Sequence, residues 1–387
     1  MAYKRACMIS INNPTFNARG DHKHARFYLM SAMRKYLEDR DGCPVDLIVM
    51  RSRNNDFLEY TVDVNEWDPS KYDAVYIYNS TMNFFGGVPK IGSVIAYRKF
   101  ADFTGDTYFI FTDPAPNMMI TDPCANLKSK IHGFIDRREK LREKNGERVV
   151  TDDLIKEARL LTDDVIDRID PLFKKMKVLS IGIDYNYLAS KSRSRDVQKN
   201  MPVEMIDINK YEARMFFEER LKDNDYHFDD KEIDLVYFGN RRTDARRSIV
   251  SKYFNHKDIN SLIIGFDAMA DLDLSEGVHV NSLEYMDMAN MHKYIDEKCF
   301  ATIVIGDKHA NGHAITYRLC EGLLLKCVGF VSIEYDPNKE MIKNEFLKDF
   351  IYVSSAEELH DKLQQIKSDK DLYEKLVRLE REEFEGI

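Results

Sequence analysis

Arg318 and Glu321 stand three residues apart in a stretch that the sequence predicts to be helical. Side chains at this spacing project from one face of a helix. A guanidinium can bind a phosphate through two parallel hydrogen bonds, and a carboxylate can accept hydrogen bonds from two sugar hydroxyls. Together the two residues would suit a nucleotide. The alternative is an ion pair on a solvated helix face.

The elements around this pair indicate where it would lie. The run 302–305 is short, apolar and β-branched, as in a strand buried on both faces. Glycine and asparagine interrupt the pattern at 306–312, and apolar residues then recur at helical spacing over 315–323. A strand, a polar loop and a helix in this order are typical of an open α/β sheet. Ligands bind such sheets at the carboxyl ends of the strands, beside helix N-termini.

A second candidate for anion binding is the segment 237–248, which combines a strand end, a turn at Gly239 and an Arg-rich helix start. Arg242 and Arg246 are four residues apart and share a helix face. Cations at a helix N-terminus oppose the macrodipole, so four arginines there cost stability unless an anion is bound. The pattern favours a phosphate site over a merely solvated face. It is not a P-loop, because the order GxxxxGK[ST] is absent.

Asp113 follows an apolar run, F-I-F-T, at the predicted carboxyl end of a strand. Pro114 restricts the backbone of Asp113 to extended conformations. A carboxylate in this place can act as a general base when a substrate hydroxyl is within reach. The alternative is an aspartate that caps a turn or a helix.

A loop expected after the strand at 74–78 contains two adjacent aromatic residues and two adjacent glycines. The residues are Asn83, Phe84, Phe85, Gly86 and Gly87. Aromatic side chains can stack on unpaired bases, at roughly 1–3 kcal/mol each. The alternative is a loop that is fixed in place by buried phenylalanines.

The composition limits the class of protein. The chain has 387 residues, 44% of them hydrophobic, enough for two domain cores. No apolar run approaches the ~20 residues of a membrane helix, and no signal-peptide pattern follows Met1. Six scattered cysteines without metal-ligand spacing fit reduced thiols in a cytoplasm. A net charge of −9 argues against a nucleic-acid coat protein but allows a local basic cleft.

Strands and helices alternate along the chain, which predicts parallel sheets of βαβ units. Strands are expected at 3–11, 45–50, 74–78, 107–111 and 177–183, and then at 233–238, 260–266, 302–305 and 328–333. We therefore predict an α/β protein with two Rossmann-like domains, 1–217 and 232–369, joined by a polar, acidic linker at 218–231. The charged segment 127–167 indicates a solvated helical excursion.

Three of these stretches together resemble the bacteriophage DNA β-glucosyltransferase family. They are 79–87 with Phe111-Thr112-Asp113, then 237–246, then 305–321, and their order and spacing match over most of the chain. The resemblance implies a GT-B fold whose two Rossmann-like domains face a central cleft, with a final helix at about 370–387 that packs back on the first domain. It also implies inverting transfer of a sugar from a UDP-sugar to the hydroxyl of 5-hydroxymethylcytosine in double-stranded DNA.

The resemblance assigns roles to single residues. Asp113 takes the place of the general base. The donor-binding places fall on Gly239, on Arg242, Arg246 and Arg318 for the diphosphate, on Glu321 for the ribose, and on Leu283 near the uracil. The loop facing the DNA falls on Asn83 to Gly87, with His24 and Arg26 on the same side. The family also implies a monomer in the cytoplasm of an infected bacterium, no membrane partner and no protein metal site, with Mg²⁺ or Mn²⁺ left open as an addition to the donor.

The sequence departs from the family near the sugar and the DNA. The family has an acidic residue before the first helix, near the donor sugar, where this chain has the basic stretch 22–26. A basic residue shortly after the catalytic aspartate is replaced by Pro114, Ala115 and Pro116. A pocket that loses a hydrogen-bonding partner discriminates differently among substrates. UDP-glucose is therefore the default donor and UDP-arabinose the alternative.

Two other function classes stay open at this stage. One is a GT-B transferase that glycosylates a small molecule or a protein. The other is a DNA- or nucleotide-binding module without catalysis, against which Asp113 argues.

Overall fold

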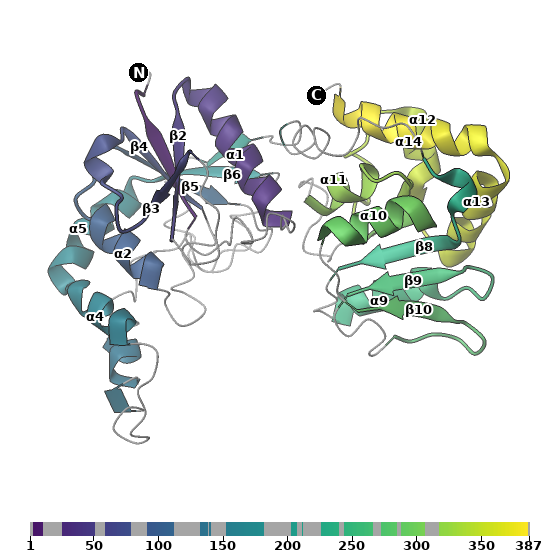
Figure 1. Ribbon diagram of the computed structural model, residues 1–387, viewed down its shortest axis with the longest axis horizontal. Coiled ribbons are helices and arrows are strands. Elements are labelled where there is room, and N and C mark those ends of the chain that lie inside the picture. The colour runs from purple at the N-terminus through teal and green to yellow at the C-terminus, as the bar shows by residue number, and fades with distance from the viewer. Residues whose placement is uncertain are drawn as a thin grey trace. The chain divides into compact units, whose positions relative to one another are not determined.

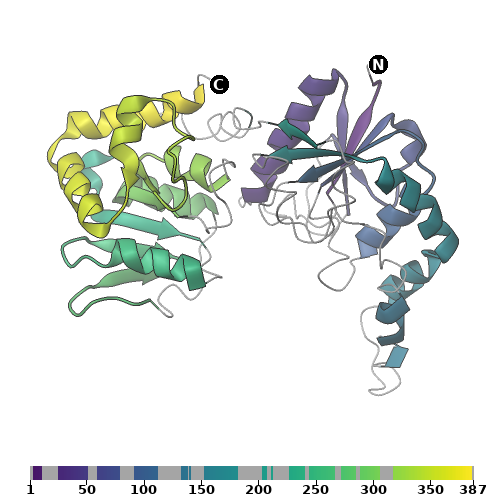
Figure 2. The same cartoon turned by 180° about the vertical axis from the view of Figure 1, so that it is seen from behind.

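The computed structural model describes residues 3–10, 25–50, 59–78, 91–111, 132–137, 139–140, 152–181, 203–206, 211, 226–239, 244–265, 272–284, 288–305 and 317–385. The chain divides into two compact units, with the main boundary between Asp207 and Ile208, ahead of the boundary predicted at 217. Each unit contains one parallel sheet with helices on both faces (Figures 1 and 2). In the described part of the chain no helix is long and apolar enough to span a membrane.

The sheet of the first unit has seven strands, and every neighbouring pair is parallel. The strands are β1 (Ala6–Ile9), β2 (Val45–Val49), β3 (Thr61–Asp63), β4 (Ala74–Tyr78), β5 (Asp106–Phe111), β6 (Lys177–Ile181) and β7 (Val203–Ile206), in the order β3-β2-β1-β4-β5-β6-β7. Helices α1 (Ala25–Asp41) and α2 (Ile91–Phe100) lie on opposite faces of this sheet (Figure 1). A short 3-10 turn, η1 (Pro69–Lys71), precedes β4.

Both faces of the central strands are buried, which explains why they appear in the sequence as continuous apolar runs. Cys7 and Val75 belong to the core beneath α2. One face of each of two further helices, α4 (Asp152–Leu160) and α5 (Asp163–Lys174), packs into the same core. These two helices carry Ile155, Ala158 and Ile169 into that core. The expectation that 127–167 is a solvated excursion is therefore wrong for the buried face of these helices.

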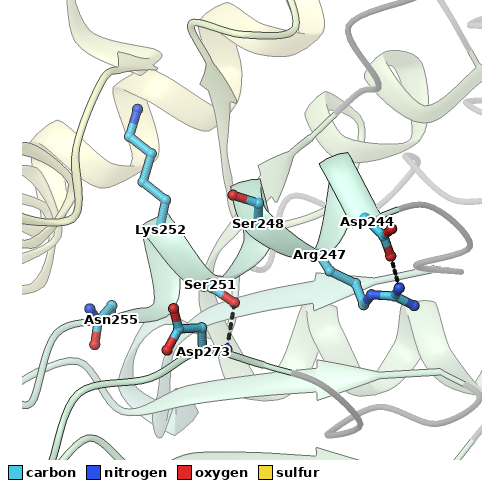
Figure 3. Close-up of a pocket in the computed structure, with 7 residues that line it drawn as sticks. All are labelled: Asp244, Arg247, Ser248, Ser251, Lys252, Asn255 and Asp273. Carbon is cyan, nitrogen blue, oxygen red and sulfur yellow. Dashed lines mark hydrogen bonds and ion pairs between the residues drawn. The ribbon is translucent and has the colours of Figure 1, made fainter.

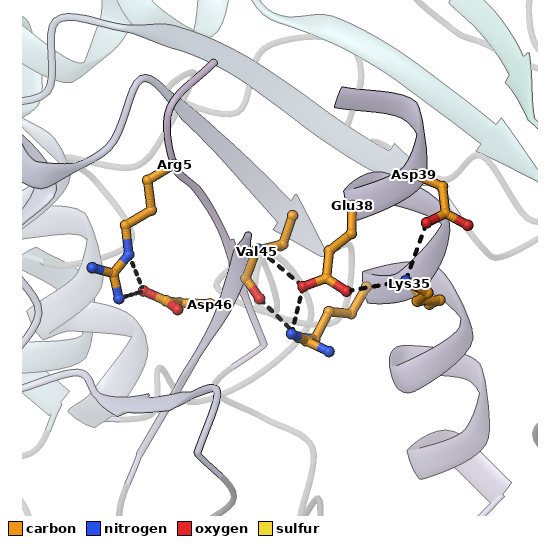
Figure 4. A network of polar contacts seen from close by, with 7 residues as sticks. Arg5, Lys35, Glu38, Asp39, Val45 and Asp46 are labelled. Atoms are coloured by element: carbon orange, nitrogen blue, oxygen red, sulfur yellow. Dashed lines mark hydrogen bonds and ion pairs between the residues drawn. The ribbon is translucent and has the colours of Figure 1, made fainter. Parts of the chain in front are cut away.

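A network of charged side chains fixes the amino-terminal end of this sheet (Figure 4). Arg34 of α1 donates from Nε to the carbonyl oxygen of Val45 at 2.8 Å. It also pairs with Glu38, whose carboxylate accepts from the Val45 N–H at 3.3 Å. Beside them, Asp46 accepts from Arg5 Nε at 2.8 Å. These contacts join α1 and the start of β1 to β2, at the edge opposite the carboxyl ends of the strands, so they stabilise the fold.

The second unit contains a six-stranded parallel sheet in the order β10-β9-β8-β11-β12-β13. Its strands are β8 (Ile233–Phe238), β9 (Ser261–Ile264), β10 (Val280–Leu283), β11 (Cys299–Val304), β12 (Val328–Ser332) and β13 (Tyr352–Val353). Helices α9 (Asp244–Phe254) and α10 (Met288–Lys298) lie on opposite faces (Figures 1 and 2), and α11 (Tyr317–Leu323) packs on β11 and β12. The α/β architecture with two Rossmann-like sheets is thus confirmed.

The last three helices, α12 (Glu345–Ile351), α13 (Ala356–Ser368) and α14 (Lys370–Glu385), belong to the second unit, as does the 3-10 turn η3 (Phe228–Asp230). Helix α14 packs on β12 and on α11, α12 and α13. Tyr373 is fully buried and donates its hydroxyl to the carbonyl oxygen of Lys326 at 2.7 Å. The final helix had been expected to pack on the first domain. The apolar stripe of α14 is buried in the second unit's own core, and packing of this helix on the first domain stays a prediction.

Glu380 of α14 is a buried carboxyl group at the centre of this packing. Its Oε1 accepts from the Gly329 N–H at 2.9 Å, while Oε2 has no hydrogen-bond partner in the described structure. Burial raises the pKa of Glu380 well above its ordinary value of 4.5, and the Gly329 N–H and the Arg381 charge oppose this only in part.

We therefore expect Glu380 to keep its proton in the folded protein at a pH where the unfolded chain has lost it. The stability that it contributes is complete below about pH 4.3 and is lost as pH rises through the folded-state pKa. Glu380→Gln cannot titrate, so the free energy of unfolding of the variant should improve relative to wild type as pH rises from 4 to 8. Urea unfolding across this range measures the difference. The exposed Glu382→Gln controls for net charge, and a difference independent of pH would contradict the prediction.

Candidate functional site

The carboxyl ends of three neighbouring strands meet in register in the second unit. Pairing places Phe238 beside Ile264, and Ile264 beside Leu283. The turns that follow are linked by backbone hydrogen bonds. Gly239 N–H donates to Ile264 O at 3.1 Å, and Gly265 N–H donates to Leu283 O at 3.2 Å. Two predicted donor residues, Gly239 and Leu283, therefore lie at the same edge of one sheet, the edge where open α/β sheets bind ligands.

Two glycines allow this edge to be so compact. Gly239 has a backbone φ angle of 131°, which residues that carry a side chain rarely adopt. A Cβ atom placed on Gly265 would lie 2.7 Å from the carbonyl oxygen of Gly239. The sequence pointed to Gly239 but missed Gly265. The signal for Gly265 was present, because it follows the apolar run of β9 directly.

Helix α11 is seated against the sheet at the same edge. A Cβ atom on Gly322 would lie 2.7 Å from Cγ2 of Val304, and one on Gly329 would lie 2.7 Å from the carbonyl oxygen of Gly322. Thr302 of β11 donates its hydroxyl to the same Gly322 carbonyl at 3.3 Å. The backbone of α11 thus lies against the Val304 and Thr302 side chains of β11 and against the backbone of β12, which fixes the position of the neighbouring Glu321.

Glu321 is buried, with 2% of its side chain exposed, and its Oε1 lies 2.7 Å from Nε2 of His292 in α10. His292 is also buried, and its ring stands edge-on to Phe238, the last residue of β8, with ring centroids 6.3 Å apart. The alternative of a solvated ion pair is therefore wrong for Glu321. Sequence reasoning missed His292, which has no motif around it.

Arg246 lies in the first turn of α9 and is partly buried. Its neighbour Arg247 pairs with Asp244, also in the first turn. Asp244 is favourable at a helix N-terminus and offsets part of the repulsion expected from the arginine cluster. The expected need for an anion thus applies to fewer arginines than the count alone indicates.

The exposed side of α9 carries a polar pocket (Figure 3). Its lining is Asp244, Arg247, Ser248, Ser251, Lys252, Asn255 and Asp273. Ser251 Oγ accepts from the Asp273 N–H at 3.0 Å, and Asn255 Oδ1 accepts from the Ser275 N–H at 2.8 Å. These contacts tie the chain after β9 to α9. None of the predicted donor residues lines this pocket.

Several predicted site residues lie outside the described residues. They are Asp113, Arg242, His24, and Asn83, Phe84, Phe85, Gly86 and Gly87. Arg26 and Arg318 belong to α1 and α11, but their side chains are outside the description. In the first unit, β1, β4 and β5 pair in parallel register and end at Ile9, Tyr78 and Phe111. The chain therefore enters the segments of His24, Phe84 and Asp113 from one edge of the sheet. Within the described ranges, no three His, Cys, Asp or Glu residues are grouped as metal ligands.

The comparisons with known proteins agree on one group of enzymes. A family model described as bacteriophage T4 beta-glucosyltransferase matches residues 7–170. The DNA beta-glucosyltransferase of Enterobacteria phage T4 is 21% identical over 383 residues, which cover 98% of this chain and 93% of the relative. The predicted resemblance is confirmed.

Solved structures of the T4 phage enzyme extend this likeness to three dimensions. Its complex with UDP and Mn²⁺ superimposes with a TM-score of 0.68 at 20% identity, covering 99% of this chain and 95% of that one. A mutant in complex with UDP-glucose gives a TM-score of 0.67 with the same identity and coverage. The fold is GT-B, with one Rossmann-like domain in each unit.

Gly265→Ala tests the close approach of Gly265 to Gly239 at this edge of the sheet. The added Cβ would meet the Gly239 carbonyl oxygen, a backbone atom that cannot rotate away. We expect a loss of roughly 1–3 kcal/mol in the free energy of unfolding, measured by urea denaturation. Gly133→Ala is the control, because a Cβ there meets nothing within 4 Å in a helical segment. It should be neutral or stabilising by up to about 1 kcal/mol, and equal effects of the two variants would refute the argument.

Proposed function

We propose that this protein is a UDP-sugar-dependent DNA glycosyltransferase. It transfers a sugar, glucose by default, to the hydroxyl of 5-hydroxymethylcytosine in double-stranded DNA, with inversion at the sugar carbon. The observation that carries the proposal is the match to the T4 DNA beta-glucosyltransferase over 98% of the chain. The ordered carboxyl edge around Gly239, Leu283 and Glu321 supports it from the structure. We further propose that it acts as a monomer in the cytoplasm of an infected bacterium.

The described donor edge fits a nucleoside diphosphate. Glu321 holds a buried carboxylate, an acceptor-only group suited to ribose hydroxyls, on a helix held against the sheet. Gly239 and Gly265 let the turns after β8 and β9 approach each other closely at this edge, which holds the strand ends together beside the proposed ligand. Arg242, Arg246 and Arg318 supply positive charge that stabilises the diphosphate as its negative charge grows during bond cleavage.

Transfer to the acceptor requires a general base on the protein and a hydroxyl group on the DNA. In our proposal Asp113 takes the proton from the hydroxymethyl group of the base as the oxygen attacks C1 of the sugar. The new C–O bond forms on the face opposite the diphosphate, the glycosidic bond to the diphosphate breaks, and UDP leaves with the electron pair. The target base has to leave the helical stack to reach the protein, which costs a few kcal/mol. We propose that Asn83 to Gly87, His24 and Arg26 contact the DNA.

The distribution of charge along the chain supports DNA as the acceptor despite the acidic total. Up to Asp207 the chain has 32 Lys and Arg against 30 Asp and Glu, and from Ile208 on it has 25 against 36. The acidic excess is therefore confined to the donor half. Five segments of the first half follow the carboxyl ends of strands and together contain 11 Lys and Arg against 6 Asp and Glu. They are 11–24, 51–58, 79–90, 112–131 and 182–202, after β1, β2, β4, β5 and β6 respectively. Basic residues are thus enriched where phosphates would approach.

Glucose is the default sugar because the similar T4 structures include a complex with UDP-glucose. Arabinose is the alternative, since the basic stretch 22–26 stands where the family has an acidic residue near the sugar. A divalent cation such as Mg²⁺ or Mn²⁺ would add positive charge at the diphosphate when bound. The T4 complex with UDP contains Mn²⁺.

Transfer itself is tested by mass spectrometry of duplex DNA incubated with UDP-glucose or UDP-arabinose. We expect a hexose on each 5-hydroxymethylcytosine and no change in duplexes with unmodified cytosine, which offers no hydroxyl to deprotonate. Asp113→Asn should lower the transfer rate by about 10²–10⁴ with UDP affinity unchanged. Addition of a pentose alone would replace the sugar and keep the mechanism, whereas no addition from either donor would refute the acceptor assignment.

The donor site is tested separately by calorimetry with UDP. Arg246→Ala and Arg318→Ala should each weaken binding by roughly 1.5–3 kcal/mol, the scale of a charged hydrogen bond. Arg247→Ala is the matched control, because that side chain pairs with Asp244 and lines the pocket on the exposed side of α9. Unchanged affinity in both test variants would place the diphosphate elsewhere.

A further inference from the structure

The contact between His292 and Glu321 joins two helices that reach the donor edge from different strands. His292 belongs to α10, which leads into β11, and Glu321 belongs to α11, which follows β11. Both side chains are at most 2% exposed, and 2.7 Å separates Nε2 from Oε1. A carboxylate can only accept hydrogen bonds, so the proton of this contact lies on Nε2 when Glu321 is ionised.

The imidazole is itself held in place. Met291 and Ile295, on either side of His292 in α10, are buried in the core with Phe238 and Ile264. The ring of His292 stands at 76° to the ring of Phe238. Glu321 is fixed from the other side by Gly322, whose Cα lies against β11. Neither partner can turn away without disturbing packed residues, so the direction of the carboxylate is set by the fold.

A fixed carboxylate matters for binding a diol. The two oxygens of a carboxylate offer about four lone-pair positions, so one carboxylate can accept hydrogen bonds from an imidazole N–H and from hydroxyl groups at the same time. A carboxylate that is free to rotate loses conformational entropy on binding two hydroxyls, whereas one already oriented does not. A buried carboxylate also needs a polar partner to remain ionised and thus a good acceptor.

We propose that His292 is a positioning residue for nucleotide recognition: through Glu321 it orients the acceptor that binds the ribose hydroxyls of the donor. The inference rests on the proposed function, because it takes the ligand of Glu321 to be a uridine nucleotide. It adds a residue 29 positions before Glu321, and it makes the distinction between ribose and deoxyribose depend on that residue.

The test compares the affinity of the full-length protein for UDP and for 2′-deoxy-UDP by calorimetry. Wild type should prefer UDP. His292→Phe keeps a ring beside Phe238 but cannot donate, so affinity for UDP should fall about tenfold, a loss of one oriented hydrogen bond to a charged group, while affinity for 2′-deoxy-UDP changes less than twofold. His292→Gln can place an amide N–H near the position of Nε2 and should restore the preference. His292→Asn is too short to do so, and it replaces the Phe variant if that variant does not fold.

The outcomes distinguish failure of the positioning role of His292 from failure of the proposed function. Equal loss of affinity for both nucleotides in His292→Phe or His292→Asn would mean that the pair only holds the helices together, and it would overturn the inference. A preference for UDP that survives these variants would do the same. A wild type that binds UDP without preferring it to 2′-deoxy-UDP would overturn the ribose role of Glu321 and the inference with it. A wild type that binds neither nucleotide would overturn the proposed function itself.

Discussion

Parallel pairing is the constraint on which the arrangement of this protein depends. When neighbouring strands run in the same direction, every strand has its carboxyl end at one edge of the sheet, and each connection has to return across a face. In the second unit this brings the ends of β8, β9 and β10 level and places α9 and α11 just beyond the ends of β8 and β11. The strand order reverses between β8 and β11, so the connections that leave these two strands diverge and leave space for a ligand.

The same constraint decides which parts of the fold the sequence predicts. The inner strands are covered on both faces, so their apolar runs could be recognised without any structure. The strands that were missed are β3, β7, β10 and β13, and these are the four edge strands of the two sheets. β13 has only two residues, and the exposed residues of β10 leave no apolar run. β10 ends at Leu283, and α10 begins at Met288.

Candidate site residues could be selected from the sequence where they lie in a local pattern beside a strand end. They could not be selected where their place in the site depends on a tertiary contact. Gly239 and Glu321 could be selected because a glycine turn and a helical spacing are local patterns. His292 could not, because the role that we propose for it depends on a partner on another helix and on the aromatic ring of Phe238. The packing of α14 in the second unit also depends on tertiary contacts, with β12 and three neighbouring helices. An amphipathic helix shows in its sequence that one face is buried, but not which unit covers it.

The close packing of α11 on its sheet restricts how this part of the protein can move. Gly322 and Gly329 carry no side chains, so the backbone of α11 lies against the Val304 side chain of β11 and against the backbone of β12. This helix therefore cannot slide or tilt without a clash. Interdigitated side chains permit small shear motions between packed elements, whereas direct backbone contact leaves little room for them. The end of the sheet at which Glu321 lies is then a rigid reference point. Any conformational closure that accompanies turnover has to be carried by other segments, with α11 and its sheet moving as one body.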